Sequence, residues 1–395
     1  HAAVDAILGA VSDVIGTLTA PEFAPLRQLR LVRYRPNPHT PPLAQVTTMH
    51  DKASTLTSLD RHDWVVVGAT PTPLGNLTHA NQPWCDLLVL DESSQLSLPL
   101  ALAAATPLHA DGQIIVVGDP RQMPAIVSHD WEHEQHPLFR RYPAYLSLYD
   151  YVAAMVVGVP RVQLAESRRV PQQVAAFLND AIYRHDGIDY HSHQQTRIPL
   201  IRTLDPLLHA VFDPAATMVL IRHDEAASHT KNPFEVALVL HLLRALIAAG
   251  YDGATGYGVV VPHRMQRAAI STALAAHTAA PDPHTTHWPG IDTVERFQGS
   301  QRQIMFVSAT ESHPSTIARN ERFLYDARRL NVALSRAQRK VVLIAAHTVF
   351  AHTPSDPLLR QQPAIWQQYA QWCNLHVADL AFQGVALTIT QQQHL

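Results

Sequence analysis

LLVLDESSQ, residues 87–95, is an apolar run that ends in two adjacent acidic residues, Asp91 and Glu92. Unbroken runs of Val, Ile and Leu are typical of strands that are buried on both faces of a parallel sheet. A second run, QIIVVGD at residues 113–119, also ends in an acidic residue. Ligands of open α/β sheets bind outside the carboxyl ends of the strands. These two runs therefore predict a sheet edge where acidic side chains are placed to bind a ligand.

Similar apolar runs recur along the chain, separated by segments that are long enough to form helices. The other runs are residues 29–35, 64–70, 217–224, 257–263, 304–311 and 340–346. Between two of them, PFEVALVLHLLRALIAAG at residues 233–250 has a helical pattern and ends in a Gly suited to cap it. The predicted fold class is α/β with parallel sheets.

The length of 395 residues allows about two to three domains, and 47% hydrophobic residues can form a sizeable core. The strand–helix pattern breaks in an aromatic, Pro-containing stretch within residues 124–161, which predicts a domain boundary near residue 158. We therefore expect a first domain over residues 1–158 and a second over residues 159–350. Residues 351–395 are predicted to be a tail that packs on the second domain.

Composition narrows the possible classes of protein. No apolar run reaches the roughly 18 residues of a membrane-spanning helix. Two cysteines are too few for a disulfide framework or a zinc ribbon, so a reducing cytoplasm is expected. The net charge of −3 gives no overall basic field, and the basic residues are Arg except for Lys52, Lys231 and Lys340. Any phosphate contact must therefore be predicted residue by residue.

A strand that ends in Asp-Glu suits nucleotide hydrolysis. The first acid, Asp91, can hold Mg²⁺ through its water shell, and the second, Glu92, can polarise the attacking water. Two adjacent acids on a surface would look the same, so the dipeptide alone decides nothing. The next run supplies the context, because it leads into GDPRQMPAI at residues 118–126. There Gly118 and Pro120 predict a tight turn from which Gln122 projects.

These two segments resemble the superfamily 1 helicases, in the branch that includes the nonsense-mediated-decay RNA helicase and the Okazaki-fragment helicase–nuclease. The family's Asp-Glu-x-x-Gln and Gly-Asp-x-x-Gln-Leu-Pro boxes correspond to Asp91–Gln95 and Gly118–Pro124. The resemblance continues in the family's order over residues 68–75, 164–183, 259–270, 291–301 and 328–346. It implies two RecA-like domains with parallel sheets, the first incomplete at its amino end.

The resemblance also implies an ATP-dependent helicase or translocase that moves 5′ to 3′ on single-stranded DNA or RNA, with ATP and Mg²⁺ between the domains. Gln122 would sense the γ-phosphate, and Arg169 and Arg336 would stabilise the charge of the transition state. Four other arginines are expected to be solvated or paired at the surface: Arg168, Arg328, Arg329 and Arg339. The resemblance further implies nucleotide contacts at Gln95, Gly118, Asp119, Gly299 and Gln301.

For nucleic acid, the resemblance implies contacts to the sugar-phosphate backbone, which a translocase needs in order to accept any sequence. The corresponding positions are Thr70, Pro262, His263, Arg264 and Thr293. One departure from the family is Gln301, which stands where the fifth motif has a Glu that holds the ribose hydroxyl. Gln301 lacks that charge, so nucleotide affinity or sugar preference is in question.

A phosphate-binding loop of the form Gly-x-x-x-x-Gly-Lys-Ser/Thr is missing from this sequence. None of the lysines follows a glycine, and GATPTPLGN at residues 68–76 has Asn76 where the lysine belongs. HAAVDAIL at residues 1–8 resembles the motif that follows this loop, so we expect the loop to lie upstream of residue 1. Two alternatives remain: a degenerate module that binds nucleic acid without hydrolysis, or the motor of a helicase–nuclease or defence effector whose nuclease lies outside this chain.

Overall fold

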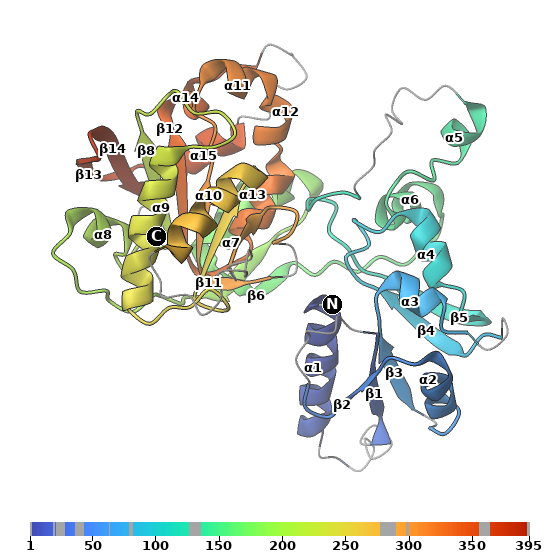
Figure 1. Ribbon diagram of the computed structural model, residues 1–395. Helices are drawn as coiled ribbons and strands as arrows, with labels where there is room; N and C mark the ends of the chain where they lie inside the picture. Colours follow the sequence, from blue (N-terminus) through green and yellow to red (C-terminus); the bar gives the residue numbers. More distant parts are fainter. Residues whose placement is uncertain are drawn as a thin grey trace. The chain divides into compact units, whose positions relative to one another are not determined.

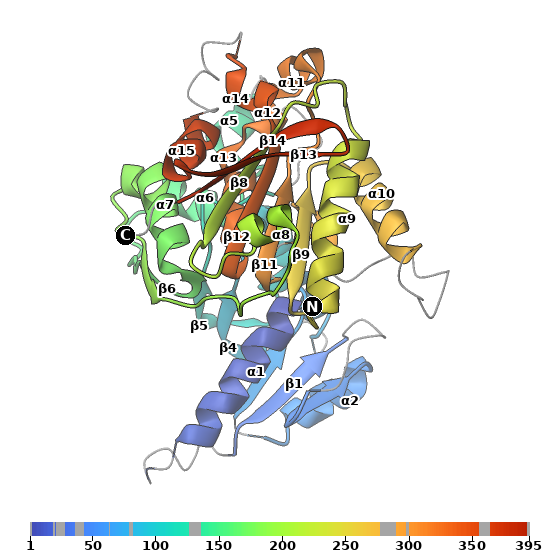
Figure 2. The ribbon, with the colours of Figure 1, turned by 90° about the vertical axis from the view of Figure 1, so that its left-hand side faces the viewer.

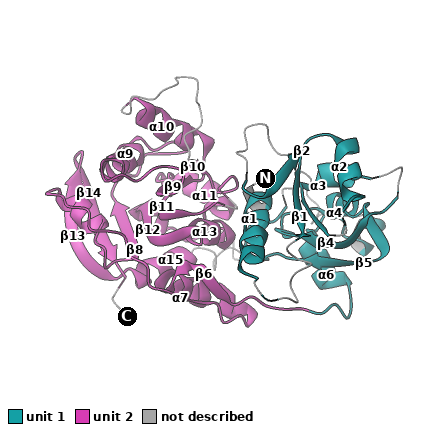
Figure 3. Cartoon of the chain, turned by 90° about the horizontal axis from the view of Figure 1, so that it is seen from below, with its two compact units in different colours: residues 1–160 teal, residues 161–395 magenta. Residues whose placement is uncertain are grey.

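The protein is described by a computed structural model for residues 2–18, 20, 28–35, 43–62, 64–78, 82–125, 136–276, 290–297, 300–354 and 364–392. The chain divides into two compact units, residues 1–160 and 161–395 (Figure 3). The boundary predicted near residue 158 lies close to this division. No helix in the described ranges has both the length and the apolar character that crossing a membrane requires.

Unit 1 contains two parallel sheets, with strand orders β2-β1-β3 and β4-β5 (Figure 1). Its strands are β1 (Arg30–Tyr34), β2 (Val46–Met49), β3 (Val65–Gly68), β4 (Cys85–Leu90) and β5 (Leu108–Val116). Its helices are α1 (Ala2–Thr17), α2 (Lys52–Leu59), α3 (Pro71–Gly75), α4 (Leu98–Ala104), α5 (Pro137–Arg141) and α6 (Leu148–Met155).

The pair β4–β5 is covered on one face only by the described residues. Leu88 and Leu90 pack in a buried cluster with residues of α4 and with Leu148. On the opposite face, Leu87 and Val89 are 50% and 51% exposed, and Ile115, which lies opposite Val89, is 47% exposed. These runs were predicted to be buried on both faces. The described part of unit 1 supplies no helix or strand over the second face, so an apolar surface stays open.

Unit 2 is built on a seven-stranded sheet of order β10-β9-β11-β12-β8-β14-β13, in which β14 pairs antiparallel with both β8 and β13 and the other pairs are parallel. Its strands are β8 (Met218–His223), β9 (Tyr257–Val261), β10 (Ile291–Thr293), β11 (Arg302–Ser308), β12 (Ala337–Ala346), β13 (Leu375–Phe382) and β14 (Val385–Gln391). A separate parallel pair joins β6 (Glu166–Pro171) to β7 (His191–Gln194). The predicted tail thus supplies β14, which pairs with β8 in the main sheet.

Helices cover this sheet, and most residues of the central strands β8, β9, β11 and β12 are buried, as expected for parallel strands. The helices are α7 (Gln172–Ala181), α8 (Pro206–Val211), α9 (Pro233–Ala248), α10 (Arg264–Ala275), α11 (Pro314–Arg319), α12 (Glu321–Leu324), α13 (Ala327–Leu334), α14 (His347–Ala351) and α15 (Ala364–Trp372), with a 3₁₀ turn at Tyr183–Asp186. The predicted end of α9 is confirmed: Gly250 follows it with φ of +87°, the left-handed conformation that a capping glycine adopts. Asn232 caps its start by accepting a hydrogen bond from the Glu235 N–H at 2.9 Å.

Lys340 is fully buried in unit 2, where its Nζ donates to the carbonyl oxygens of Asp213, at 2.9 Å, and Ala216. Burial lowers the pKa of Lys340 to about 7, although the charges of Asp213 and Cys373 oppose the shift. An unfolded chain keeps this proton up to a pH of about 10.4. Between these two values the unfolded state binds more protons, so the free energy of unfolding rises with pH across this window.

We expect this contribution to have a slope of up to about 1.4 kcal/mol per pH unit. To isolate the contribution of Lys340, the free energy of unfolding in urea is measured between pH 7 and 10 for the wild type and for Lys340→Met. All other titrating groups are common to both proteins. The free energy of unfolding of the wild type, minus that of Lys340→Met, should increase as pH rises. A difference that is independent of pH would contradict the assigned pKa.

Candidate nucleotide and nucleic-acid sites

The acidic turn, residues 91–95, directly follows β4 and presents both predicted carboxylates. Asp91 is exposed, and its Oδ1 accepts a hydrogen bond from the Glu92 N–H at 2.9 Å. Glu92 has a φ of +51°, and its Oε2 accepts from Gln95 Nε2 at 3.2 Å. A positive φ is unusual for a residue with a side chain, and such conformations cluster at functional sites. The turn thus orients two acids at the carboxyl end of a strand.

The segment after β5 packs directly on the acidic turn. Ser93 donates to the Val117 carbonyl oxygen from its N–H at 2.9 Å and from its Oγ at 2.6 Å. A Cβ at Gly118 would lie 2.7 Å from Ser93 Oγ and 3.0 Å from the Ser94 nitrogen. A side chain at position 118 would therefore push the acidic turn away. Close packing explains this glycine, which was predicted as a nucleotide contact.

Asp119 and Gln122 form a compact turn beside these acids. Asp119 accepts hydrogen bonds from the Arg121 N–H at 2.8 Å and from Gln122 Nε2 at 3.2 Å. The Gln122 side chain therefore lies against Asp119, whereas the sequence predicted that it projects from the turn. Thr70, the predicted nucleic-acid contact of unit 1, precedes α3 after the end of β3, and its side chain makes no capping hydrogen bond.

The acidic turn fits the way in which Mg²⁺ is usually held. Mg²⁺ keeps several waters and binds through one or two carboxylates together with substrate phosphates. Asp91, exposed and next to Glu92, offers this minimal set. A site made by protein alone has no candidate in the described ranges, where no group of three or more His, Cys, Asp or Glu residues could hold a metal ion.

Unit 2 carries the two predicted catalytic arginines. Arg169 lies in β6, and its Nε is buried without a hydrogen-bond partner among the described residues. Arg336 is buried between the end of α13 and the start of β12, and its carbonyl oxygen accepts from the Arg302 N–H at 3.0 Å. Gln301, just before β11, is exposed. Gly299, the other predicted nucleotide contact here, lies outside the described residues.

The predicted nucleic-acid contacts of unit 2 follow two neighbouring parallel strands. Pro262, His263 and Arg264 follow β9, and Thr293 ends β10 opposite Val261. Arg264 is exposed, whereas Thr293 is buried, its N–H donating to Asp292 Oδ1 at 2.8 Å. The structure therefore brings these positions to one sheet edge but leaves Arg264 as the accessible charge among them.

His263 is held by two residues that the motif comparison did not single out. Its Nε2 lies 2.6 Å from Oε1 of the buried Glu311, and its ring stacks on Phe323 with a centroid distance of 5.7 Å and an interplanar angle of 15°. Glu311 follows β11, so its strand-end position was the available signal. Phe323 lies in α12 and carried none.

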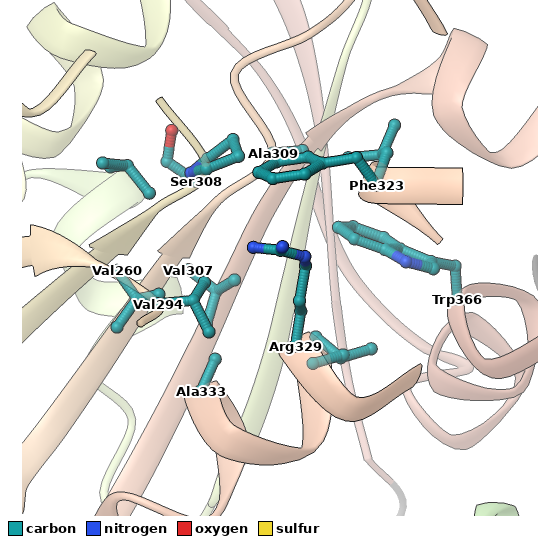
Figure 4. A pocket seen from close by; sticks show the side chains of 13 residues that line it. Val260, Val294, Val307, Ser308, Ala309, Phe323, Arg329, Ala333 and Trp366 are labelled. Atoms are coloured by element: carbon teal, nitrogen blue, oxygen red, sulfur yellow. The ribbon is translucent and has the colours of Figure 1, made fainter. Parts of the chain in front are cut away.

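A small apolar cavity of about 30 Å³ lies beside this edge, lined by residues of β9, β11 and α13 (Figure 4). Arg329 points into it with its guanidinium 3.7 Å from the centroid of the Phe323 ring, and it forms an ion pair with Glu295. Burial alone would raise the pKa of Glu295, but a hydrogen bond from its own backbone and the charge of Arg329 lower it. Arg329 was expected at the surface. It is paired but largely enclosed, and it ties the segment after β10 to α13.

Comparison with known proteins gives a family and several relatives. The family model described as an AAA domain matches residues 146–348. DNA replication ATP-dependent helicase/nuclease JHS1 of Arabidopsis thaliana is 24% identical over 69% of this chain and 20% of its own length. The 5′-3′ DNA helicase ZGRF1 of Mus musculus is 26% identical over 66% of this chain and 13% of its own length. DNA-binding protein SMUBP-2 of Mus musculus is 27% identical over 78% of this chain and 30% of its own length.

Proposed function

This chain belongs to the AAA-domain family, among the superfamily 1 helicases, and from that premise we propose that it is the motor core of an ATP-dependent helicase or translocase. The motor would move 5′ to 3′ along single-stranded DNA or RNA. One observation carries the proposal: the acidic turn and the Asp119–Gln122 turn meet at the carboxyl ends of the paired strands β4 and β5. This is where ligands of α/β sheets bind.

The proposed nucleotide is ATP with Mg²⁺, which supplies charge neutralisation on the phosphates. Asp91 would hold the ion through water, and Glu92 would accept a proton from the attacking water. Gln122, now hydrogen-bonded to Asp119, would exchange that bond for one to the γ-phosphate. Arg169 and Arg336 would stabilise negative charge on the transferred phosphoryl group. The buried Nε of Arg169 supports this role, since a bound anion would supply the partner that the described residues do not.

The proposed motor needs a phosphate-binding loop, and this sequence does not contain the residue pattern of one. In the described part of unit 1, β5 pairs with β4 alone, and the exposed face of the β4–β5 pair is apolar. We propose that a further parallel strand, ending in the missing loop, adds beside β5. Its loop would then lie next to Asp119 and the acidic turn, and its helix would cover Leu87, Val89 and Ile115.

We propose single-stranded DNA or RNA as the polynucleotide, and a reducing compartment as the place where the protein acts. Thr70, Pro262, His263, Arg264 and Thr293 are proposed along the strand, with backbone contacts that suit either DNA or RNA. Cys85 and Cys373 are both free, which agrees with a reducing compartment such as the cytoplasm. A nuclease or another domain, if it accompanies this motor as in the helicase/nuclease JHS1, would lie outside this chain.

The deciding experiment measures ATP hydrolysis stimulated by single strands, for this chain and for one extended at its amino end by a strand and a phosphate-binding loop. We expect hydrolysis from the extended chain only. The absent lysine favours a second candidate, a module that binds nucleic acid without hydrolysis. An extended chain that binds single strands but never turns over ATP would establish that candidate and overturn the motor.

A further inference from the structure

Unit 2 exposes a group of basic side chains, most of them outside the helicase-like motifs, which we name the basic rim: Lys231, Arg264, Arg319 and Arg322. Lys231 lies in the loop between β8 and α9, Arg264 begins α10, and the other two lie in α11 and α12. Figure 2 shows this loop and the helices α11 and α12 at the same end of the unit. Only Arg264 was predicted to contact nucleic acid.

Hydrogen bonds join the loop that carries Lys231 to the start of α11. The N–H groups of Ser312 and His313 donate to the Ser228 carbonyl oxygen at 3.1 and 2.9 Å, and the Ser228 N–H donates to Ser312 Oγ at 2.8 Å. The rings of His229 and His313 lie 4.9 Å apart. These contacts hold the loop of Lys231 against the start of α11, the short helix that ends in Arg319.

The same surface continues to α10 and α12. The Asn232 N–H donates to Oε1 of the buried Gln266 at 2.8 Å, which fixes the Lys231 loop against the first turn of α10. Asn320 Nδ2, between α11 and α12, donates to Glu311 Oε1 at 2.8 Å, the same oxygen that His263 contacts. The rim thus adjoins the predicted contacts Pro262–Arg264.

Among the described residues, the carboxylates near Lys231, Arg264 and Arg319 are buried, hydrogen-bonded or next to a histidine. Glu311 and Glu321 are buried. Glu225 accepts hydrogen bonds from Ser312 Oγ at 2.6 Å and from Asn232 Nδ2 at 2.8 Å. Asp224 is exposed and lies 3.5 Å from His347. Lys231, Arg264 and Arg319 are thus the accessible charges here, and exposed cations in a chain of net charge −3 suit an anionic polymer as the partner.

We propose that the basic rim is a further stretch of the single-strand binding surface, in which Lys231 and Arg319 each contact a backbone phosphate beyond Pro262–Arg264. This inference rests on the proposed function. The side chain of Met265 is 59% exposed beside Thr230 on this surface, with 3.5 Å between Thr230 Oγ1 and Met265 Sδ. It offers an apolar contact for a sugar or base, while the rim neutralises phosphates without reading sequence.

The test is the salt dependence of binding to a labelled single strand of mixed sequence, using this chain and fluorescence anisotropy. Each phosphate contact on a single strand contributes about 0.7 to the slope of log K against log salt. Lys231→Ala and Arg319→Ala should each lower that slope by about 0.7, and each should weaken binding about fivefold at roughly 0.1 M salt. Arg244→Ala, an exposed arginine in α9, serves as the matched control and should change neither quantity.

The outcomes separate this inference from the proposed function. If Lys231→Ala and Arg319→Ala bind as the wild type does while Arg264→Ala binds more weakly, the rim proposal is overturned and single-strand binding stands. If the wild type binds no single strand of DNA or RNA, both fail. If the variants lose affinity without a change in salt slope, the residues act through folding or packing, and the phosphate contacts are refuted.

Discussion

Glu92→Gln, made in a chain that carries a phosphate-binding loop, is expected to keep ATP binding and to lower turnover at least about a hundredfold. Glu92 is the second acid of the turn that Ser93 anchors to the end of β5. Glutamine has nearly the same shape, and it can still pair with Gln95, which now donates to Glu92 Oε2 at 3.2 Å. The substitution removes the ability to take a proton from water and little else.

Single-turnover and steady-state hydrolysis, with nucleotide binding measured in parallel, check this expectation. Asp86→Asn is the matched control, because Asp86 is an exposed acid on the same strand, far from its carboxyl end. Its turnover should equal that of the wild type. A Glu92→Gln protein with unchanged turnover would show that another group activates the water.

Arg336→Ala is expected to lower ATP hydrolysis about a thousandfold or more, the range in which arginine fingers act. Arg336 is placed by rigid surroundings, since it follows the buried helix α13 and its carbonyl oxygen is bonded to the Arg302 N–H. Arg336→Lys keeps the charge but loses the planar, multidentate donor, so it should recover only part of the activity.

Hydrolysis rates of both variants, alongside single-strand affinity, separate chemistry from folding. Arg328→Ala removes a neighbouring arginine that is paired with Asp326 at 3.0 Å, and it should leave the rate unchanged. Retained hydrolysis in Arg336→Ala would exclude the finger role. Loss of both hydrolysis and strand binding would instead indicate that α13 or β12 has been disrupted.

Much of the fold follows from local patterns. The apolar runs at residues 87–92, 113–119, 257–263 and 340–346 correspond to strands β4, β5, β9 and β12. A short, unbroken apolar run is typical of a strand in the core of a folded chain. Short or polar strands were not predicted, among them β2, VTTM, and β7, HSHQ. Their residues carry no apolar period, and hydrogen bonds to a neighbouring strand are what hold them extended.

The sequence by itself determined the α/β class and the position of the acidic pair after a strand, since both depend on residues adjacent in the chain. Only the tertiary structure decided what surrounds those residues. Gly118 is required because Ser93 and Ser94 fill the space beside it. Arg329 is largely enclosed because it forms an ion pair with Glu295 and lies over the ring of Phe323. The loop of Lys231 lies beside the start of α11 because Ser228 and Ser312 form a hydrogen bond across many intervening residues. Contacts between segments distant in sequence leave no periodic trace in the chain, and so they appear only once it has folded.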